Sequence, residues 1–443
     1  MAEFSRPENP QEFEANFAPV HPMMNETQAY FESSRCLYCY DAPCINACPT
    51  GIDIPLFIRQ IHNGNLTGAA KTIYQDNFFG FACGKVCPTA VLCEGACVYN
   101  HQDVKPIEIG RLQAYATAKA MVSGKKWLSP GRPNGYRVAI IGAGPSGISC
   151  ACELRMLGYE VDIFEAKNQP SGLTFHGVAP YKISNEEVLE EVRWLEEQLG
   201  FHIHYRQSVE SEDQIRQLEE TYDAIFLGIG LGPTQSLRLP GENLHNSWGA
   251  VEFIENLRLH QHKVTVGKKV IILGGGNTAM DAASEAARLG AAQVIIAYRR
   301  GKREMSAYSF EYELAKAVGA KGMFYVQPVE IVGKSAVEGV KFARVQVADE
   351  QPVTMPDSVF VEPCDMVIRA TGQEKMTRFL DMIDGLKWDG KGRIEADSLT
   401  CQTGNPKYFA GGDAVNGGAE VVNAVADGKK AAKGIHDYLF LGK

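Results

Sequence analysis

Residues 136–147 read YRVAIIGAGPSG, a short run of β-branched and apolar residues that ends in a glycine-rich turn. A helical run follows, and residues 159–166 then read YEVDIFEA, which is typical of a second strand. The same order of strand, turn, helix and strand returns in residues 268–300, KKVIILGGGNTAMDAASEAARLGAAQVIIAYRR. Two such units predict an α/β fold with parallel sheets that carry helices on both faces.

The first glycine-rich turn has the spacing of a dinucleotide-binding fingerprint, G-x-G-x-x-G, between an expected strand and an expected helix. Glycines there allow a tight turn and a close approach of the backbone to a pyrophosphate, while the helix N-terminus supplies N–H groups. An acid at the end of the second strand can accept hydrogen bonds from a ribose. The alternative is a glycine-rich turn without a ligand. The expected contacts are Gly142, Gly144, Pro145, Ser146, Gly147 and Glu165.

The second turn is the G-x-G-x-x-A variant, and two arginines stand where the first unit has its acid. An acid would repel a 2'-phosphate, whereas two guanidinium groups can pair with it, so this unit is expected to prefer NADP over NAD. The alternative is a solvated basic turn, and Arg303 is a third, weaker candidate. The expected contacts are Gly274, Gly275, Gly276, Asn277, Thr278, Arg299 and Arg300.

Residues 408–432, YFAGGDAVNGGAEVVNAVADGKKAA, read as a strand, a Gly-Gly-Asp turn and a helix. The stretch resembles the second FAD fingerprint of flavoproteins with two dinucleotide domains, in which the Asp holds the ribityl chain. VIRATG (367–372) and DAIFLGIG (223–230) resemble the connecting strands of that family. A Ser171-Gly172-Leu173 sequence departs from the usual Gly-Gly-Leu flavin contact, which puts the local loop conformation in question. The resemblance implies FAD contacts at Gly172, Leu173, Gly372, Gly412 and Asp413.

Eight of the twelve cysteines lie between residues 36 and 97, in CLYCYDAPCINACP (36–49) and CGKVCPTAVLCEGAC (83–97). The first run resembles the bacterial ferredoxin pattern C-x2-C-x2-C-x3-C-P. Zinc also uses C-x2-C pairs, and disulfides form in oxidising compartments. We favour iron–sulfur clusters, because a redox-inert ion beside a flavin domain has no electron to pass on.

From the first of these cysteines to the C-terminus, the sequence resembles the reductase subunit of bacterial dihydropyrimidine dehydrogenase and the N-terminal half of the animal enzyme. CxxCxDAPCxxxCP, CGxVCPTxxLCxxxC and PIxIGxLQ carry this resemblance, which extends more loosely to the glutamate synthase small subunit. It implies one [4Fe-4S] cluster on Cys36, Cys39, Cys44 and Cys97. It implies a second on Cys48, Cys87, Cys93 and Gln113, with Cys83 as a nearby spare.

The resemblance implies the electron-input subunit of an NADPH-dependent dihydropyrimidine dehydrogenase. Electrons would pass from NADPH through FAD and the two clusters to an FMN-containing (β/α)8-barrel partner that reduces uracil or thymine, and no side chain need act as an acid or nucleophile. The chain ends soon after the Gly-Gly-Asp helix, so the barrel is expected to be another polypeptide. The alternatives are a glutamate synthase or transhydrogenase type subunit, and a non-enzymatic or stand-alone diaphorase role.

Charge, apolar runs and Pro/Gly clusters indicate the class of protein and its domain boundaries. A net charge of -9 without a basic stripe argues against a nucleic-acid surface, and no apolar run suits a signal peptide or a membrane span, so we expect a cytoplasmic protein. The Pro/Gly cluster SPGRPNG (129–135) is a candidate linker. The expected domains are a helical cluster domain (1–130), an FAD domain in two parts (131–256 and 374–443) and an NADP domain inserted between them (257–373).

Overall fold

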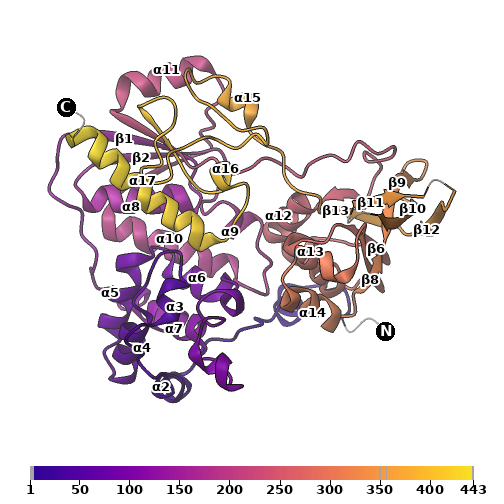
Figure 1. The fold of residues 1–443 in the computed structure, drawn as a ribbon, viewed down its shortest axis with the longest axis horizontal. Coiled ribbons are helices and arrows are strands. Elements are labelled where there is room, and N and C mark those ends of the chain that lie inside the picture. The colour runs from indigo at the N-terminus through magenta and orange to yellow at the C-terminus, as the bar shows by residue number, and fades with distance from the viewer. Residues whose placement is uncertain (1–3, 349–350, 356, 442–443) are drawn as a thin grey trace. The chain divides into compact units, whose positions relative to one another are not determined.

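Two parallel five-stranded sheets organise the chain, as seen in the computed structural model (Figure 1), which describes residues 4–348, 351–355 and 357–441. The chain divides into two units. The major unit comprises residues 20–175, 182–231 and 375–443, and the inserted unit comprises the described residues up to 19 together with 176–181 and 232–374.

The sheet of the major unit has the strand order β14-β4-β1-β2-β3, and every neighbouring pair is parallel. Its central strand carries the VAII run and is buried along four of five residues, as expected for a parallel sheet covered on both faces. The strand β14 comes from the C-terminal segment, so the sheet is completed only after the inserted unit. The strands are β1 (Arg137–Ile141), β2 (Glu160–Glu165), β3 (His202–Tyr205), β4 (Ala224–Leu227) and β14 (Tyr408–Ala410).

Helices of the major unit cover this sheet. The helices α17 and α8 are far apart in the sequence but pack against each other along their lengths (Figure 1). The first turn of α10 is fixed by a capping box between Ser184 and Glu187. These helices are α8 (Pro145–Met156), α9 (Leu173–His176, at the unit boundary), α10 (Asn185–Leu199), α11 (Glu212–Thr221), α15 (Thr377–Leu380), α16 (Asp413–Asn416) and α17 (Val421–Leu441).

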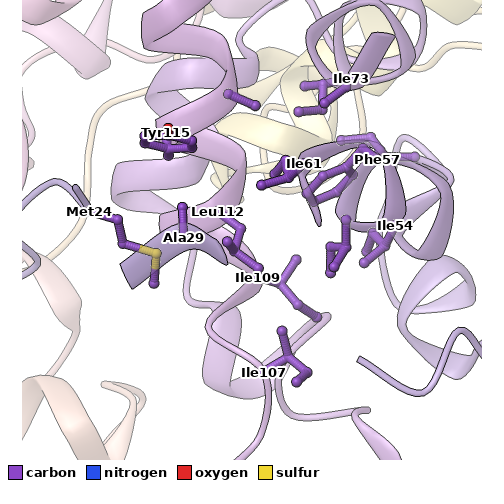
Figure 2. Close-up of a cluster of buried hydrophobic side chains, with 14 of the residues drawn as sticks. Met24, Ala29, Ile54, Phe57, Ile61, Ile73, Ile107, Ile109, Leu112 and Tyr115 are labelled. Atoms are coloured by element: carbon purple, nitrogen blue, oxygen red, sulfur yellow. The ribbon is translucent and has the colours of Figure 1, made fainter. Parts of the chain in front are cut away.

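The N-terminal part of the major unit is helical, as the periodicity predicts. In α4 the buried Ile54, Phe57, Ile58 and Ile61 follow a one-face spacing and enter a common core (Figure 2), against which several of the clustered cysteines pack. The elements are α2 (Glu26–Ser34), α3 (Pro43–Asn46), α4 (Ile54–His62), α5 (Leu66–Asp76), α6 (Gly80–Val86), η1 (Thr89–Val91), η2 (Val98–Gln102) and α7 (Ile109–Met121).

The inserted unit has a second parallel sheet, with the order β5-β13-β6-β7-β8. Its strands are β5 (Ser247–Gly249), β6 (Lys269–Leu273), β7 (Gln293–Tyr298), β8 (Lys321–Phe324) and β13 (Met366–Arg369). Its helices are α1 (Pro10–Asn16), α12 (Ala250–His260), η3 (Gln261–Lys263), α13 (Asn277–Arg288), η4 (Lys302–Glu304) and α14 (Ser309–Ala317).

An antiparallel sheet also belongs to the inserted unit and was not expected from the sequence. In it β10 pairs with β9, β11 and β12. These strands are β9 (Val326–Val332), β10 (Gly339–Ala348), β11 (Gln351–Thr354) and β12 (Phe360–Pro363).

Two expected domain boundaries differ from the structure. Residues 232–256 belong to the inserted unit, because β5 pairs with β13 there and α12 follows it directly. The described residues before 20 also belong to the inserted unit rather than to the helical cysteine region: the Asn16 side-chain amide donates to the Arg288 carbonyl at the end of α13, 2.8 Å away. Both segments are short and give little periodic signal.

Candidate cofactor sites

Four of the predicted cluster ligands surround one hollow of the major unit. Cys36 follows α2, Cys39 and Cys44 flank the start of α3, and Cys97 precedes η2. All four line a space of about 390 Å³, a volume that includes the open solvent at its entrance. The other lining residues are almost all apolar, and Leu37 beside the hollow is 55% exposed. The fold therefore brings together the whole first ligand set.

The second predicted set surrounds a separate hollow of about 360 Å³, again counted to open solvent. Cys48 follows α3, Cys87 ends α6, and Cys93 follows η1. Gln113 reaches the same hollow from the middle of α7, and Val422 reaches it from α17. Val422 is more than three hundred positions from the other residues in the sequence, and the fold of the major unit brings it to them.

Gln113 is buried, and its orientation is fixed by the backbone. Its side-chain Nε2 donates to the Gly80 carbonyl at 2.7 Å, at the start of α6. With the nitrogen held there, the amide oxygen is left as the atom available to a metal. The predicted spare, Cys83, is also buried and lines the hollow, and its thiol lies 3.8 Å from Asn77 Oδ1.

The chemistry of these thiols fits iron–sulfur clusters. Burial raises the pKa of the Cys44 thiol to about 12, so it becomes a thiolate only when a metal displaces its proton. Within residues 4–348, 351–355 and 357–441, no three His, Cys, Asp or Glu side chains are arranged to hold a single metal ion. The cysteines stand around two hollows, and four ligands at each are what two [4Fe-4S] clusters require.

The first glycine-rich turn has the shape that a pyrophosphate needs. Gly142 has φ +102°, and a Cβ there would lie 2.4 Å from the Gly228 carbonyl oxygen. A Cβ at Gly147 would lie 2.0 Å from the Gly142 oxygen, whereas at Gly144 the nearest atom would be 3.9 Å away. The first and third glycines are thus required by packing, and the middle one leaves open the face that a phosphate approaches. Pro145 begins α8 directly behind it.

Glu165 ends β2 beside this turn, as predicted. Its carboxylate accepts hydrogen bonds from the Ala143 and Lys167 backbone N–H groups, each at 2.8 Å. A carboxylate has about four acceptor positions, so these two bonds orient the side chain and leave capacity for a ribose hydroxyl.

The Ser171-Gly172-Leu173 loop keeps a glycine-like shape despite its serine. Ser171 has φ +75°, and its N–H donates to the Ala143 carbonyl at 2.6 Å. Its hydroxyl is fully buried and has no partner among the described residues. Gly172 also has a positive φ, and a Cβ there would lie 3.1 Å from the Gly144 Cα. Leu173 begins α9. The serine at this position therefore holds a strained, positive φ that a glycine would adopt without cost.

The C-terminal fingerprint meets the first one within the major unit. Gly412, with φ +71°, leaves room for the Ser146 hydroxyl, which would lie 2.9 Å from a Cβ at that position. Asp413 begins α16, and its Oδ1 accepts the Ala419 N–H at 3.1 Å. Burial raises the pKa of Asp413. The two expected halves of the FAD site thus lie together around Ser146.

The turn of the inserted unit follows the same plan. A Cβ at Gly274 would lie 2.2 Å from the Ala370 oxygen, and one at Gly275 would lie 2.6 Å from the Tyr298 ring, whereas at Gly276 the nearest atom would be 3.4 Å away. Asn277 Oδ1 accepts the Tyr308 N–H at 2.9 Å, and Thr278 is exposed. Gly372, predicted as a flavin contact, lies past β13 in this unit.

Arg299 and Arg300 follow β7 directly, next to this turn. Arg299 is exposed and Arg300 is partly buried, and in the described part of the chain no acidic side chain forms an ion pair with either. Their charges are therefore available to an anion.

Two family models match the chain. Residues 13–125 match dihydropyrimidine dehydrogenase domain II, 4Fe-4S cluster, and residues 136–428 match pyridine nucleotide-disulphide oxidoreductase. The chain belongs to the pyridine nucleotide-disulphide oxidoreductase family.

Relatives in this family carry two kinds of name. The glutamate synthase [NADPH] small chain of Halomonas elongata is 33% identical over 96% of this chain and 93% of its own. The NAD-dependent dihydropyrimidine dehydrogenase subunit PreT of Salmonella typhimurium is 34% identical over 92% of this chain and 94% of its own. In fold the chain is similar to Mycobacterium tuberculosis FprA in complex with NADPH, with a TM-score of 0.57 and 22% identity over 70% of this chain and 86% of that one.

These matches confirm the predicted fold class and cofactor classes. The chain is an NAD(P)H-dependent oxidoreductase of this family, with FAD and [4Fe-4S] as its cofactors. None of its described helices is both long and apolar enough to span a bilayer.

Several residues at the sites were missed by the sequence reasoning. Asn77 and Val422 line the second hollow, and the buried Glu191 of α10 accepts hydrogen bonds from the N–H groups of Phe81 and Ala82 in the first turn of α6. None of these residues belongs to a recognisable motif. They come close to the cysteines only when the chain folds.

Proposed function

We propose that this chain is the electron-input subunit of an NADPH-dependent dihydropyrimidine dehydrogenase. Its partner would be an FMN-containing (β/α)8-barrel subunit that reduces uracil or thymine. The observation that carries the proposal is the pair of hollows in the major unit, one lined by four cysteines and the other by three cysteines and Gln113.

The cofactors supply the chemistry: a nicotinamide donates a hydride, and flavin and clusters divide the electron pair into single electrons. The residues of this chain bind and orient. We assign Cys36, Cys39, Cys44 and Cys97 to one cluster, and Cys48, Cys87, Cys93 and Gln113 to the other. The glycines, Glu165 and Asp413 would hold FAD, and Arg299 with Arg300 would hold the 2'-phosphate of NADPH.

The surroundings of the two hollows favour an order for electron transfer. Val422 belongs to α17, which follows the Gly412–Asp413 turn of the expected flavin site, and it lines the second hollow. The first hollow instead has the exposed Leu37 in its lining, and Tyr40, which follows the lining residue Cys39 in the sequence, is fully exposed. We infer that the second cluster faces the flavin and that the first faces the partner.

A glutamate synthase small subunit is the alternative, and the Halomonas elongata relative favours it. Gln113 and the DAPC spacing favour the pyrimidine role, because the glutamate synthase branch is expected to have Glu at the first position and a different spacing at the second. The name of the PreT relative specifies NAD, so the preference for NADPH rests on the two arginines.

Reconstitution tests the proposal. The purified chain should oxidise NADPH with ferricyanide and leave uracil and thymine unchanged. Addition of the barrel subunit should give NADPH-dependent formation of the dihydropyrimidine. Uracil reduction by the chain alone would contradict the two-subunit account, and glutamate formation with a glutaminase-bearing subunit would establish the alternative.

A further inference from the structure

The second hollow contains a polar side chain that the ligand assignment does not use. Asn77 caps the C-terminus of α5, is fully buried, and lines the hollow together with Cys48, Cys87 and Gln113. An asparagine in an apolar interior is costly to bury unless its amide is hydrogen-bonded on both sides.

The orientation of the Asn77 amide is fixed by a donor. The Phe79 backbone N–H lies 2.9 Å from Asn77 Oδ1, and an N–H group can bond only to the oxygen, not to the NH2 group. The Cys83 thiol lies 3.8 Å from the same oxygen and also acts as a donor. The oxygen side of the amide is therefore satisfied, and the nitrogen points away from these two groups.

The nitrogen side is not satisfied by the protein. Asn77 Nδ2 is inaccessible to solvent and has no hydrogen-bond partner among the described residues. An NH2 group has two hydrogens to donate and no lone pair to offer, so whatever completes this site must be an acceptor. The cysteine thiolates and sulfides of a bound cluster are acceptors, and they are negatively charged.

We propose that the Asn77 side-chain amide donates a hydrogen bond to a sulfur atom of the cluster held by Cys48, Cys87, Cys93 and Gln113, and so sets the potential of that cluster. The inference rests on the proposed function for the existence of that cluster. A donor to sulfur stabilises the reduced cluster more than the oxidised one, because reduction adds a negative charge. Asn77 therefore raises the midpoint potential of the second cluster and is a positioning residue rather than a ligand.

The first hollow provides an internal reference for this inference. Its lining contains no Asn or Gln side chain, and the hydroxyl of its one polar aromatic residue, Tyr99, already donates to the Arg35 carbonyl at 2.7 Å. Loss of the Asn77 amide should therefore change one cluster and leave the other as it is.

The test is an EPR-monitored redox titration of the anaerobically purified holoprotein. In Asn77→Ala the midpoint potential of the second cluster should fall by at least the 59 mV that corresponds to a tenfold change in a one-electron equilibrium, while that of the first cluster stays constant. Asn77→Asp keeps the oxygen that accepts the Phe79 N–H and removes the donor, so it should lower the same potential. The matched control is Asn65→Asp at the exposed N-cap of α5, where an aspartate can still accept the Gly68 N–H; it should change neither potential.

Unchanged potentials in Asn77→Ala with full iron content would overturn the inference, as would an equal shift of both clusters. If Asn77→Ala loses iron, Asn77→Leu decides instead, because leucine has a similar size, no donor and no charge, and an unchanged potential in that variant would also refute the inference. Wild-type protein with fewer than two clusters would instead contradict the proposed function, so the two failures are distinguishable.

Discussion

The two hollows of the major unit differ in what surrounds their thiols. The first has four cysteines in a mostly apolar lining that includes the exposed Leu37. The second has three assigned cysteines, two buried amides and a residue from the helix that follows the C-terminal flavin fingerprint. Similar cysteine spacings thus lead to different environments, since the environment comes from α5, α7 and α17 and not from the cysteine motifs.

A parallel difference separates the two glycine-rich turns. In both turns the first position must be glycine, because a Cβ there would clash with a neighbouring carbonyl oxygen. At the end of the next strand, however, the first turn has the buried Glu165 and the second has Arg299 and Arg300. We expect the shared backbone shape to bind a pyrophosphate in either case, and the residues at the end of the next strand to select the nucleotide. In both comparisons the motif defines the class of cofactor and the neighbouring elements define its properties.

The largest effect is expected from removing a ligand of the second hollow. Cys48→Ser should eliminate one cluster, halve the iron content and abolish electron delivery to the partner, while ferricyanide reduction survives because the flavin site is intact. Cys83→Ser is the matched control, since Cys83 lines the same hollow without an assigned iron. Iron analysis and EPR check both variants. Loss of a cluster in the Cys83 variant would mean that the ligand assignment is wrong.

The contact between α10 and α6 should make stability depend on pH. Burial raises the pKa of Glu191 to about 7, against hydrogen bonds from the Phe81 and Ala82 amides and Tyr74 that lower it. A carboxyl with a raised pKa in the folded chain stabilises the fold when protonated. This contribution is complete below about pH 4.5 and is lost as pH rises through about 7, a change of about 3 kcal/mol at roughly 1.4 kcal/mol per pKa unit.

Glu191→Gln should remove this contribution, while that of Glu196, whose pKa burial also raises to about 7, remains. The variant should lose less stability between pH 5 and pH 8 than the wild type, as measured by urea unfolding at each pH. Glu186→Gln, an exposed substitution in the first turn of the same helix, is the control and should keep the wild-type profile. An identical pH profile for the wild type and Glu191→Gln would show that this carboxyl does not titrate in that range.

The comparison of the glycine-rich turns predicts a smaller, more selective effect. Replacement of Arg299 and Arg300 by Gln should reduce the preference for NADPH over NADH in kcat/KM at least tenfold, which corresponds to about 1.4 kcal/mol of 2'-phosphate pairing. Steady-state kinetics with both nucleotides measures it, and the NADH values should change little. A wild type that already prefers NADH would contradict the role given to the arginines.

The smallest effect concerns the strained loop at Ser171. Ser171→Gly should stabilise the major unit by about 1 kcal/mol, because it relieves a positive φ and removes a buried hydroxyl without a partner. Arg206→Gly relieves a similar φ of +56° at an exposed residue and should stabilise less. Urea unfolding of the apoprotein compares the two. A destabilised Ser171→Gly would contradict the strain assigned to this loop.

Much of the architecture follows from local patterns. The glycine spacings at 142–147 and 274–279, each between a buried apolar strand and a helix, predicted both parallel sheets. The insertion of one unit in the other was implied by the resemblance of residues 408–432 to a second FAD fingerprint. Short elements were missed, because the three residues of β5 carry no measurable periodicity, and the antiparallel strands β9 to β12 depend on one another for burial. The predicted cysteine sets were brought together, whereas Asn77 and Glu191 could not be predicted, because their importance comes only from contacts made across the fold.

The central claim is that the two hollows hold two clusters of four irons each. The most direct measurement is the iron, acid-labile sulfide and zinc content of anaerobically purified protein, together with the EPR spectrum of the reduced protein. The account predicts about eight iron and eight sulfide per chain and two distinguishable cluster signals. Stoichiometric zinc without sulfide, or a single cluster signal, would contradict it.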